Sequence, residues 1–169
     1  METKLQSKPE AWTGFAEILL VEDDPSDAEL TMRALANCGF APRIELASDG
    51  AEALEYIASA NLFAQKGSGA TPKLIILDLK LNGLGGLHVL RRLKADERTR
   101  GIPIVVLTSS RIGIDLAESY KLGVNSYVIK PTDPSKFTEV IGSIGRYWLG
   151  INELPSAEPQ MRNTRLAFS

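Results

Sequence analysis

The sequence predicts an α/β fold, an open, doubly wound parallel sheet of five strands with five helices on its two faces. Short apolar runs without polar alternation occur five times along the chain, as expected of strands that are covered on both faces. Each run precedes a segment whose apolar residues repeat at helical spacing. Five strand–helix pairs are too few for a closed eight-stranded barrel, which leaves the open sheet.

The first two strand–helix pairs lie between residues 18 and 72. The first strand is expected at 18–21. A helix should begin after Asp24, because an acidic N-cap followed by Pro25 is a common helix start. The second strand is expected at 43–46. Asp49 and Glu52 form a capping box that starts the second helix. The helical pattern then breaks at residue 61, and the polar, glycine-containing stretch 65–72 is predicted to be a loop.

The remaining strands are expected at 73–77, 104–107 and 126–129, each followed by a helix. Apolar residues at 87, 90 and 93 mark the third helix, a weaker pattern over 112–121 the fourth, and a start near Pro134 the fifth. For such a sheet the flavodoxin-like order 2-1-3-4-5 is a common arrangement, and we expect it here by analogy. Ligands of these sheets bind beyond the carboxyl ends of the strands, where the strand order reverses.

The composition disfavours several classes of partner. A length of 169 residues fits one domain, and a formal net charge of −2 gives no reason to expect nucleic acid or an anionic membrane. No apolar stretch is long enough to cross a bilayer, and residues 1–15 lack the apolar core of a signal peptide. The lone cysteine, Cys38, suits a reducing compartment. We therefore expect a cytoplasmic protein.

Four strands end in polar side chains that phosphoryl chemistry can use. Glu22 and Asp23 follow the first strand, Asp78 the third, Thr108 the fourth and Lys130 the fifth. Three neighbouring carboxylates repel one another and need a cation, and hard oxygen ligands select Mg²⁺ or its close relative Mn²⁺. A carboxylate beside such a cation and a lysine can attack a phosphoryl group, because both positive charges stabilise the transition state.

Each of these residues has a plainer interpretation when taken alone. Glu22 or Asp23 could only cap the following helix, Asp78 and Thr108 could be turn residues, and Lys130 could be a solvated charge. The combination favours a site, because every one of four strand ends carries a residue type that the same chemistry requires.

With these residues the sequence resembles the receiver domain of two-component response regulators over about 17–149. The resemblance is carried by Leu20-Val21-Glu22-Asp23-Asp24, Ile75-Ile76-Leu77-Asp78-Leu79, Val105-Val106-Leu107-Thr108-Ser109 and Tyr127-Val128-Ile129-Lys130-Pro131. It implies that Asp78 is the phosphoacceptor, phosphorylated by a sensor histidine kinase. It further implies metal ligation by Glu22, Asp23, Asp78 and the main-chain carbonyl of Lys80. Thr108 and Lys130 would contact the phosphoryl group.

The resemblance also implies a conformational switch. Tyr127 matches the aromatic residue that turns inward when Thr108 moves toward the phosphoryl group, although ordinary strand packing would also explain it. The Lys130–Pro131 peptide bond would be cis. One departure is Asn82, where the family usually has proline, and Lys80 and Ser110 occupy positions that tune the lifetime of the phosphorylated form. We hypothesise that Lys80 lengthens it.

Within the family, the sequence is most similar to stand-alone regulators of bacterial and cyanobacterial phytochrome kinases. Glu22, the helix start Asp24-Pro25-Ser26-Asp27 and the long loop before the third strand carry this similarity. It implies a phytochrome-type kinase as the partner. We divide the chain into an N-terminal extension at 1–15, a receiver domain at 16–149 and a C-terminal tail at 150–169.

No helix-turn-helix motif follows the receiver, so the output is expected to be a protein contact or a phosphoryl shuttle. Apolar residues continue past the usual end of the last helix, and they predict a homodimer unless they pack on their own domain. The candidate dimer residues are Tyr127, Phe137, Tyr147, Trp148, Ile151 and Leu154.

Two other function classes fit the sequence less well. A scaffold that never takes phosphate would not need the complete set of strand-end residues. A hydrolase acting on a diffusible phosphate ester would need a second acid–base group beside Asp78, and Leu79-Lys80 offers none. The predicted function is therefore that of a switch, which catalyses only its own phosphorylation and dephosphorylation.

Overall fold

The central sheet has five parallel strands in the order β2-β1-β3-β4-β5, which confirms the predicted fold class and strand order. The computed structural model describes residues 16–65 and 71–155. The strands are β1 (Ile18–Val21), β2 (Ile44–Ala47), β3 (Leu74–Leu77), β4 (Ile104–Thr108) and β5 (Ser126–Ile129). Strand order reverses at β1, which pairs with β2 on one side and β3 on the other. The carboxyl ends of β1 and β3 therefore lie side by side.

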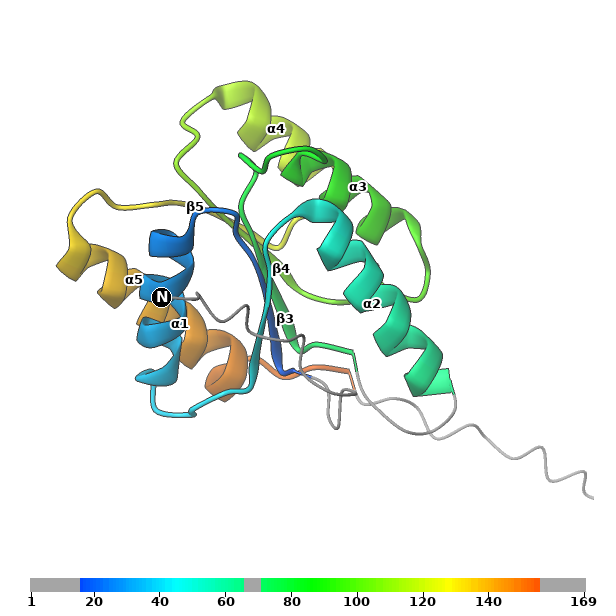
Figure 1. The fold of residues 1–169 in the computed structure, drawn as a ribbon, viewed down its shortest axis with the longest axis horizontal. Helices are drawn as coiled ribbons and strands as arrows, with labels where there is room; N and C mark the ends of the chain where they lie inside the picture. The colour runs from blue at the N-terminus through cyan, green and yellow to red at the C-terminus, as the bar shows by residue number, and fades with distance from the viewer. Residues whose placement is uncertain (1–15, 66–70, 156–169) are drawn as a thin grey trace, which may run out of the picture.

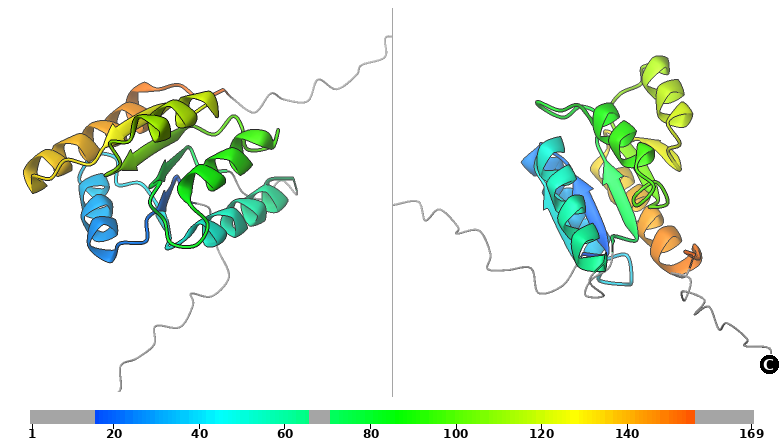
Figure 2. Two further views of the ribbon diagram at one scale, coloured as in Figure 1. Left: turned by 90° about the horizontal axis from the view of Figure 1, so that it is seen from above. Right: turned by 90° about the vertical axis from the view of Figure 1, so that its right-hand side faces the viewer.

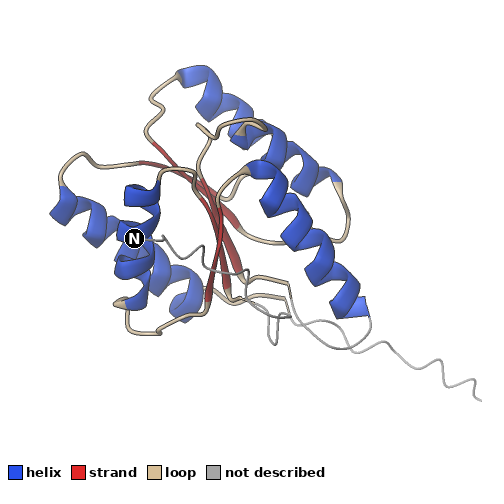
Figure 3. Cartoon of the chain, in the orientation of Figure 1, coloured by secondary structure: helices blue, strands red, loops and turns tan. Residues whose placement is uncertain are grey.

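Helices cover both faces of this sheet (Figure 1). They are α1 (Pro25–Ala36), α2 (Gly50–Gln65), α3 (Gly86–Ala95), α4 (Gly113–Lys121) and α5 (Pro134–Arg146), followed by a short π-helix, η1 (Tyr147–Ile151). α1 and α5 share one apolar cluster with the sheet, whereas α2 and α3 share the other. The two further views in Figure 2 show these helices on the two faces of the sheet. Figure 3 shows the resulting three layers, with the strands between helices. No helix in the described ranges is long and apolar enough to cross a membrane.

Three helices start at capping aspartates, of which Asp24 and Asp49 were predicted. The side chains of Asp24, Asp49 and Asp133 accept hydrogen bonds from the amides three residues later, at 2.8, 2.8 and 2.9 Å. One helix end differs from the prediction, because α2 continues to Gln65, past the break expected at residue 61. Helical backbone after α5 continues as η1 to Ile151, where the sequence shows apolar residues past the usual end of the last helix.

The core also corrects one predicted surface residue. Phe137 was expected on a dimer surface, but its side chain is only 3% exposed. It lies with Ile141 and Ile144 in the cluster between α5, α1 and the sheet. These positions, spaced by four and three residues, form the inward stripe of α5, so Phe137 belongs to the core of its own domain.

Gly86 allows α3 to pack directly on the chain that carries Asp78. A Cβ atom at this position would lie 2.1 Å from the main-chain oxygen of Asp78 and 2.5 Å from the Cα of Leu79. Backbone atoms cannot yield as the tip of a side chain can, so only glycine permits this approach. The start of α3 is thereby fixed against the site.

We predict that Gly86→Ala destabilises the fold by about 2 kcal/mol or more, because the added methyl group forces backbone atoms apart. Urea unfolding would measure the loss. Gly85→Ala is the matched control, since a Cβ there meets nothing within 4 Å. Equal stability of the two variants would show that the close approach is not a constraint.

Candidate functional site

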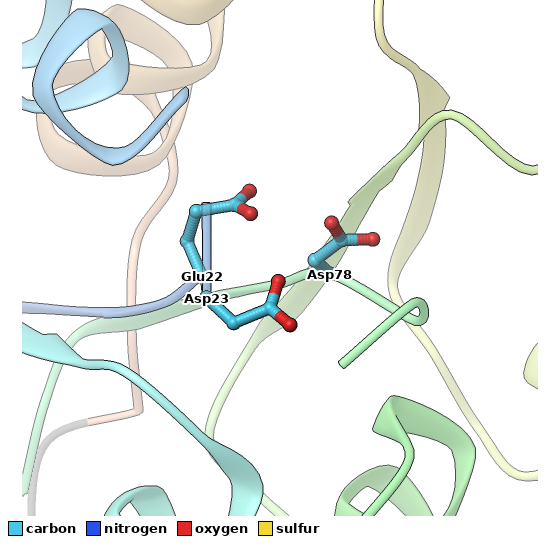
Figure 4. Close-up of side chains that lie close together, drawn as sticks. All are labelled: Glu22, Asp23 and Asp78. Carbon is cyan, nitrogen blue, oxygen red and sulfur yellow. The ribbon is translucent and has the colours of Figure 1, made fainter. Parts of the chain in front are cut away.

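Three carboxylates meet at the carboxyl edge of the sheet. Glu22 and Asp23 follow β1 and Asp78 follows β3, and each offers an oxygen within 4.8 Å of the others (Figure 4). Glu22 and Asp78 are buried, whereas Asp23 is half-buried. The parallel pairing of Val21 with Leu77 brings these strand ends together, as the sequence predicts.

Loop amides orient the three carboxylates. Asp23 Oδ2 accepts a hydrogen bond from the amide of Asn82 at 2.9 Å, and Asp78 Oδ1 accepts one from the amide of Lys80 at 3.1 Å. Glu22 Oε1 accepts one from the amide of Asp24 at 3.1 Å. The loop after β3 therefore contacts the cluster through its backbone. Ligation of a metal ion by the carbonyl of Lys80 stays a prediction.

Lys130 reaches this cluster from the end of β5. Its Nζ lies 2.7 Å from Glu22 Oε2, 2.7 Å from Asp27 Oδ2 and 2.9 Å from Asp78 Oδ2. An ammonium group has three N–H donors, so all of them are used. The side chains of Lys130, Glu22 and Asp78 are 8, 2 and 6% exposed, and their pairing is therefore poorly screened by water.

Sequence reasoning missed the role of Asp27, which it assigned only to the first turn of a helix. The signal was available, because α1 begins two residues past Asp23 and its first turn must lie beside the strand ends. Nothing in the sequence, however, shows that Asp27 points toward a lysine 103 residues away.

The charges of the site are unbalanced in favour of carboxylates. Burial raises the pKa of Glu22 to about 7, and the negative charge of Asp78 adds to this effect, although hydrogen bonding to Lys130 opposes it. Burial also disfavours the charge of Lys130, but its hydrogen bonds to Asp27, Glu22 and Asp78 outweigh burial and raise its pKa. An oxygen-only set of three carboxylates with excess negative charge fits Mg²⁺ or Mn²⁺.

Thr108 and Tyr127 are connected through Ser110. Thr108 is fully buried at the end of β4, and its Oγ1 accepts a hydrogen bond from the amide of Ser110 at 3.3 Å. The hydroxyl of Tyr127 donates to the carbonyl of Ser110 at 3.1 Å. The hydroxyl of Ser110 donates to Asp115 in the first turn of α4, a contact that the sequence did not reveal. A change at Thr108 can thus reach both Tyr127 and α4.

The predicted cis bond before Pro131 is wrong. The described residues contain no cis peptide bond, so Lys130 and Pro131 are joined by a trans bond. Trans is the usual state of such a bond, and with it Lys130 still contacts Glu22, Asp27 and Asp78.

Lys130→Met should destabilise the protein by about 3 kcal/mol without divalent cations, because it leaves buried carboxylates without their counter-charge. The pKa of Glu22 is about 7 in the folded state against 4.5 ordinarily, so ionisation of Glu22 lowers stability as the pH rises above 4.5. Without Lys130 this pKa should rise further.

The loss caused by Lys130→Met should therefore be larger at about pH 8 than at about pH 5. Urea unfolding at the two pH values measures it, with the exposed Lys121→Met in α4 as the control. A loss that is equal at both pH values, or equal to that of the control, would contradict this account of the site.

Comparison with known proteins agrees with this geometry. Residues 18–142 match the response regulator receiver domain. A probable methanogenesis regulatory protein, FilR2 of Methanothrix harundinacea, is 42% identical over 82% of this chain and 86% of that protein. The crystal structure of the phosphorylated cyanobacterial phytochrome response regulator RcpA has a TM-score of 0.75 and 35% identity, covering 85% of this chain and 100% of that one. The Mn²⁺-bound form of Rcp1, a response regulator of Synechocystis, has a TM-score of 0.74 and 31% identity, covering 82% of this chain and 98% of that one. This chain belongs to the response regulator receiver domain family.

Proposed function

We propose that the chain is a phosphorylation-dependent switch whose Asp78 accepts a phosphoryl group from a sensor histidine kinase. The observation that carries this proposal is the position of Lys130 Nζ, 2.9 Å from Asp78 Oδ2 within a cluster of carboxylates. A buried lysine aimed at a buried aspartate supplies positive charge where phosphoryl charge would develop. Glu22, Asp23, Asp78 and the carbonyl of Lys80 would hold Mg²⁺ or Mn²⁺, which supplies further neutralising charge.

The reaction needs little beyond positioning. An Asp78 oxygen attacks phosphorus, and the new oxygen–phosphorus bond forms as the phosphorus–nitrogen bond of the donor phosphohistidine breaks. The electron pair of that bond leaves on the imidazole nitrogen. Before the transfer, one N–H of Lys130 donates to Asp78 Oδ2. After the transfer, the same N–H can donate to a phosphoryl oxygen. Thr108, at the end of the adjacent strand, offers its hydroxyl to a second phosphoryl oxygen.

Engagement of Thr108 would carry the signal to the surface. If Thr108 Oγ1 turns to the phosphoryl group, it loses the hydrogen bond from the Ser110 amide. Ser110 also contacts Tyr127 and Asp115, so this loss can affect both residues. The affected surface, made by α4 and β5, exposes apolar side chains at Ile112, Ile114, Leu116, Tyr120 and Ile129. Such a surface suits a protein partner.

For the input we propose a phytochrome-type histidine kinase. RcpA and this chain match over the whole length of RcpA, and the name of RcpA connects it with a phytochrome. The name of FilR2 instead connects that protein with methanogenesis. A histidine kinase makes its phosphohistidine from ATP, which argues for a cytoplasmic location.

Incubation with Mg²⁺ and a small phosphoryl donor such as phosphoramidate should add the mass of one phosphoryl group to the protein. Asp78→Asn should abolish the addition, because the attacking oxygen is replaced by a weakly nucleophilic amide. Asn82→Asp, which adds a carboxylate to the loop without removing Asp78, tests whether the assay responds to charge alone.

Intact-protein mass spectrometry reads the outcome directly. Failure of the unchanged protein to take phosphate in the presence of Mg²⁺ would favour the scaffold interpretation. Faster transfer from a purified phytochrome kinase than from other histidine kinases would identify the input, and equal or slower transfer would refute the phytochrome assignment.

We further propose that the receiver domain, residues 16–149, forms a homodimer through the surface that η1 extends. Tyr147 and Ile151 are 47 and 69% exposed, whereas Tyr127, Trp148 and Leu154 are half-buried. η1 is held on its own domain, since a Cβ at Gly150 would lie 2.3 Å from the ring of Phe40. Of its exposed apolar side chains, Tyr147 lines a groove together with Val140, Ile144 and Trp148.

Ile151→Glu should convert a dimer into a monomer, because it places a charge in the apolar contact. Light scattering measures the mass with and without Mg²⁺ and the phosphoryl analogue beryllofluoride. Leu62→Glu on α2, at a side chain that is 58% exposed, is the control. A mass that Ile151→Glu leaves unchanged would place the interface elsewhere or exclude a dimer.

A further inference from the structure

Asp27 is the one carboxylate around Lys130 that lies outside the acidic cluster of Glu22, Asp23 and Asp78. It lies in the first turn of α1, where its amide donates to the capping carboxylate of Asp24 at 2.8 Å. Its own Oδ2 lies 2.7 Å from Lys130 Nζ, as short as the contact from Glu22. Among the described residues, Lys130 is the hydrogen-bond donor to this carboxylate.

The three acceptors of Lys130 differ in how easily they can release it. The Glu22 and Asp78 side chains are 2 and 6% exposed. Breaking the bond from Lys130 to either of them would leave a buried carboxylate that has lost one hydrogen-bond donor. The Asp27 side chain is 39% exposed, and water can replace the ammonium as its partner. Asp27 also borders a hollow of ≈ 400 Å³, lined in addition by Ser109, Thr132 and Phe137. Asp27 is therefore the acceptor that Lys130 can leave at the smallest cost.

An arriving phosphoryl group brings several acceptor oxygens and additional negative charge to the same ammonium. All three N–H donors of Lys130 are already in use. The bond to Asp78 can pass to one phosphoryl oxygen, but a second bond requires that another carboxylate release its donor. The fixed negative charge of Asp27, one ammonium group away, also opposes the incoming charge.

We propose that Asp27 is a positioning residue that holds Lys130 in the unphosphorylated protein and competes with the phosphoryl group for it. This inference rests on the proposed function of Asp78. Asp27 sets the balance between the two forms, because it stabilises the resting position of the ammonium and is released when phosphate binds. Removal of its charge should therefore favour the phosphorylated form.

The test is a titration of the purified protein with beryllofluoride at saturating Mg²⁺, followed by fluorine NMR, which counts the bound analogue. Asp27→Asn and Asp27→Ala should bind it on the order of threefold to tenfold more tightly than the unchanged protein, as expected for the loss of one nearby charge at an intermediate dielectric. Asp27→Glu, which keeps the charge, should restore the original affinity more closely than Asp27→Asn does.

Glu29→Gln is the matched control. It removes one negative charge from the same helix, but Glu29 is 69% exposed and pairs with Arg33, away from Lys130. Circular dichroism checks that each variant is folded. A merely structural role of Asp27 in starting α1 would change melting temperature but leave beryllofluoride affinity equal to that of the control.

The outcomes separate this inference from the proposed function. If the unchanged protein does not bind beryllofluoride, or if Asp78→Asn still binds it, the proposed function fails. If the unchanged protein binds it through Asp78 and Asp27→Asn binds equally or more weakly, the function stands and the competition by Asp27 is overturned.

Discussion

The site depends on one ammonium group shared among carboxylates that come from distant parts of the chain. Lys130 joins the end of β5 to Glu22 after β1, Asp78 after β3 and Asp27 in α1, over separations of 108, 52 and 103 residues. Without this charge, two of those carboxylates would be buried beside each other with only water or a metal ion to separate them. With it, the cluster keeps more carboxylates than ammonium groups, and one positive charge lies 2.9 Å from Asp78, as the proposed function requires.

The rest of the fold serves to keep that arrangement fixed. Parallel pairing places the ends of β1, β3, β4 and β5 along one edge. Gly86 lets α3 pack against the main chain of Asp78, and loop amides orient Asp23, Asp78 and Glu22. Ser110 connects Thr108 to Tyr127 and to the first turn of α4. A local change at Thr108 therefore has a short, continuous route to an exposed apolar surface.

The sequence was sufficient for most of the fold and for the residues brought to the site. Apolar runs locate all five strands within a residue or so, and the capping aspartates locate the starts of α1 and α2. Strand order makes Glu22, Asp23, Asp78, Thr108 and Lys130 neighbours, because their places at strand ends follow from the pattern alone. Helix ends were less predictable: α2 runs to Gln65, past the break expected at residue 61.

Side-chain direction was the part that the sequence could not supply. Asp27 was expected only as part of a helix start, yet it contacts Lys130, and nothing in the sequence indicated the contact between Asp115 and Ser110. Phe137 read as part of an exposed apolar stripe, yet it faces the core. The cis bond before Pro131 came from resemblance and is absent. For the side chains, the missing information is the orientation of one element against another, which a linear pattern does not contain.

A crystal structure with Mn²⁺ and beryllofluoride tests the central claim most directly, because anomalous scattering locates the metal ion independently of the protein model. This account predicts a manganese peak among Glu22, Asp23 and Asp78, with beryllofluoride on Asp78 and hydrogen-bonded to Lys130 and Thr108. A metal ion bound elsewhere, or beryllofluoride absent from Asp78 while the metal site is filled, would contradict it.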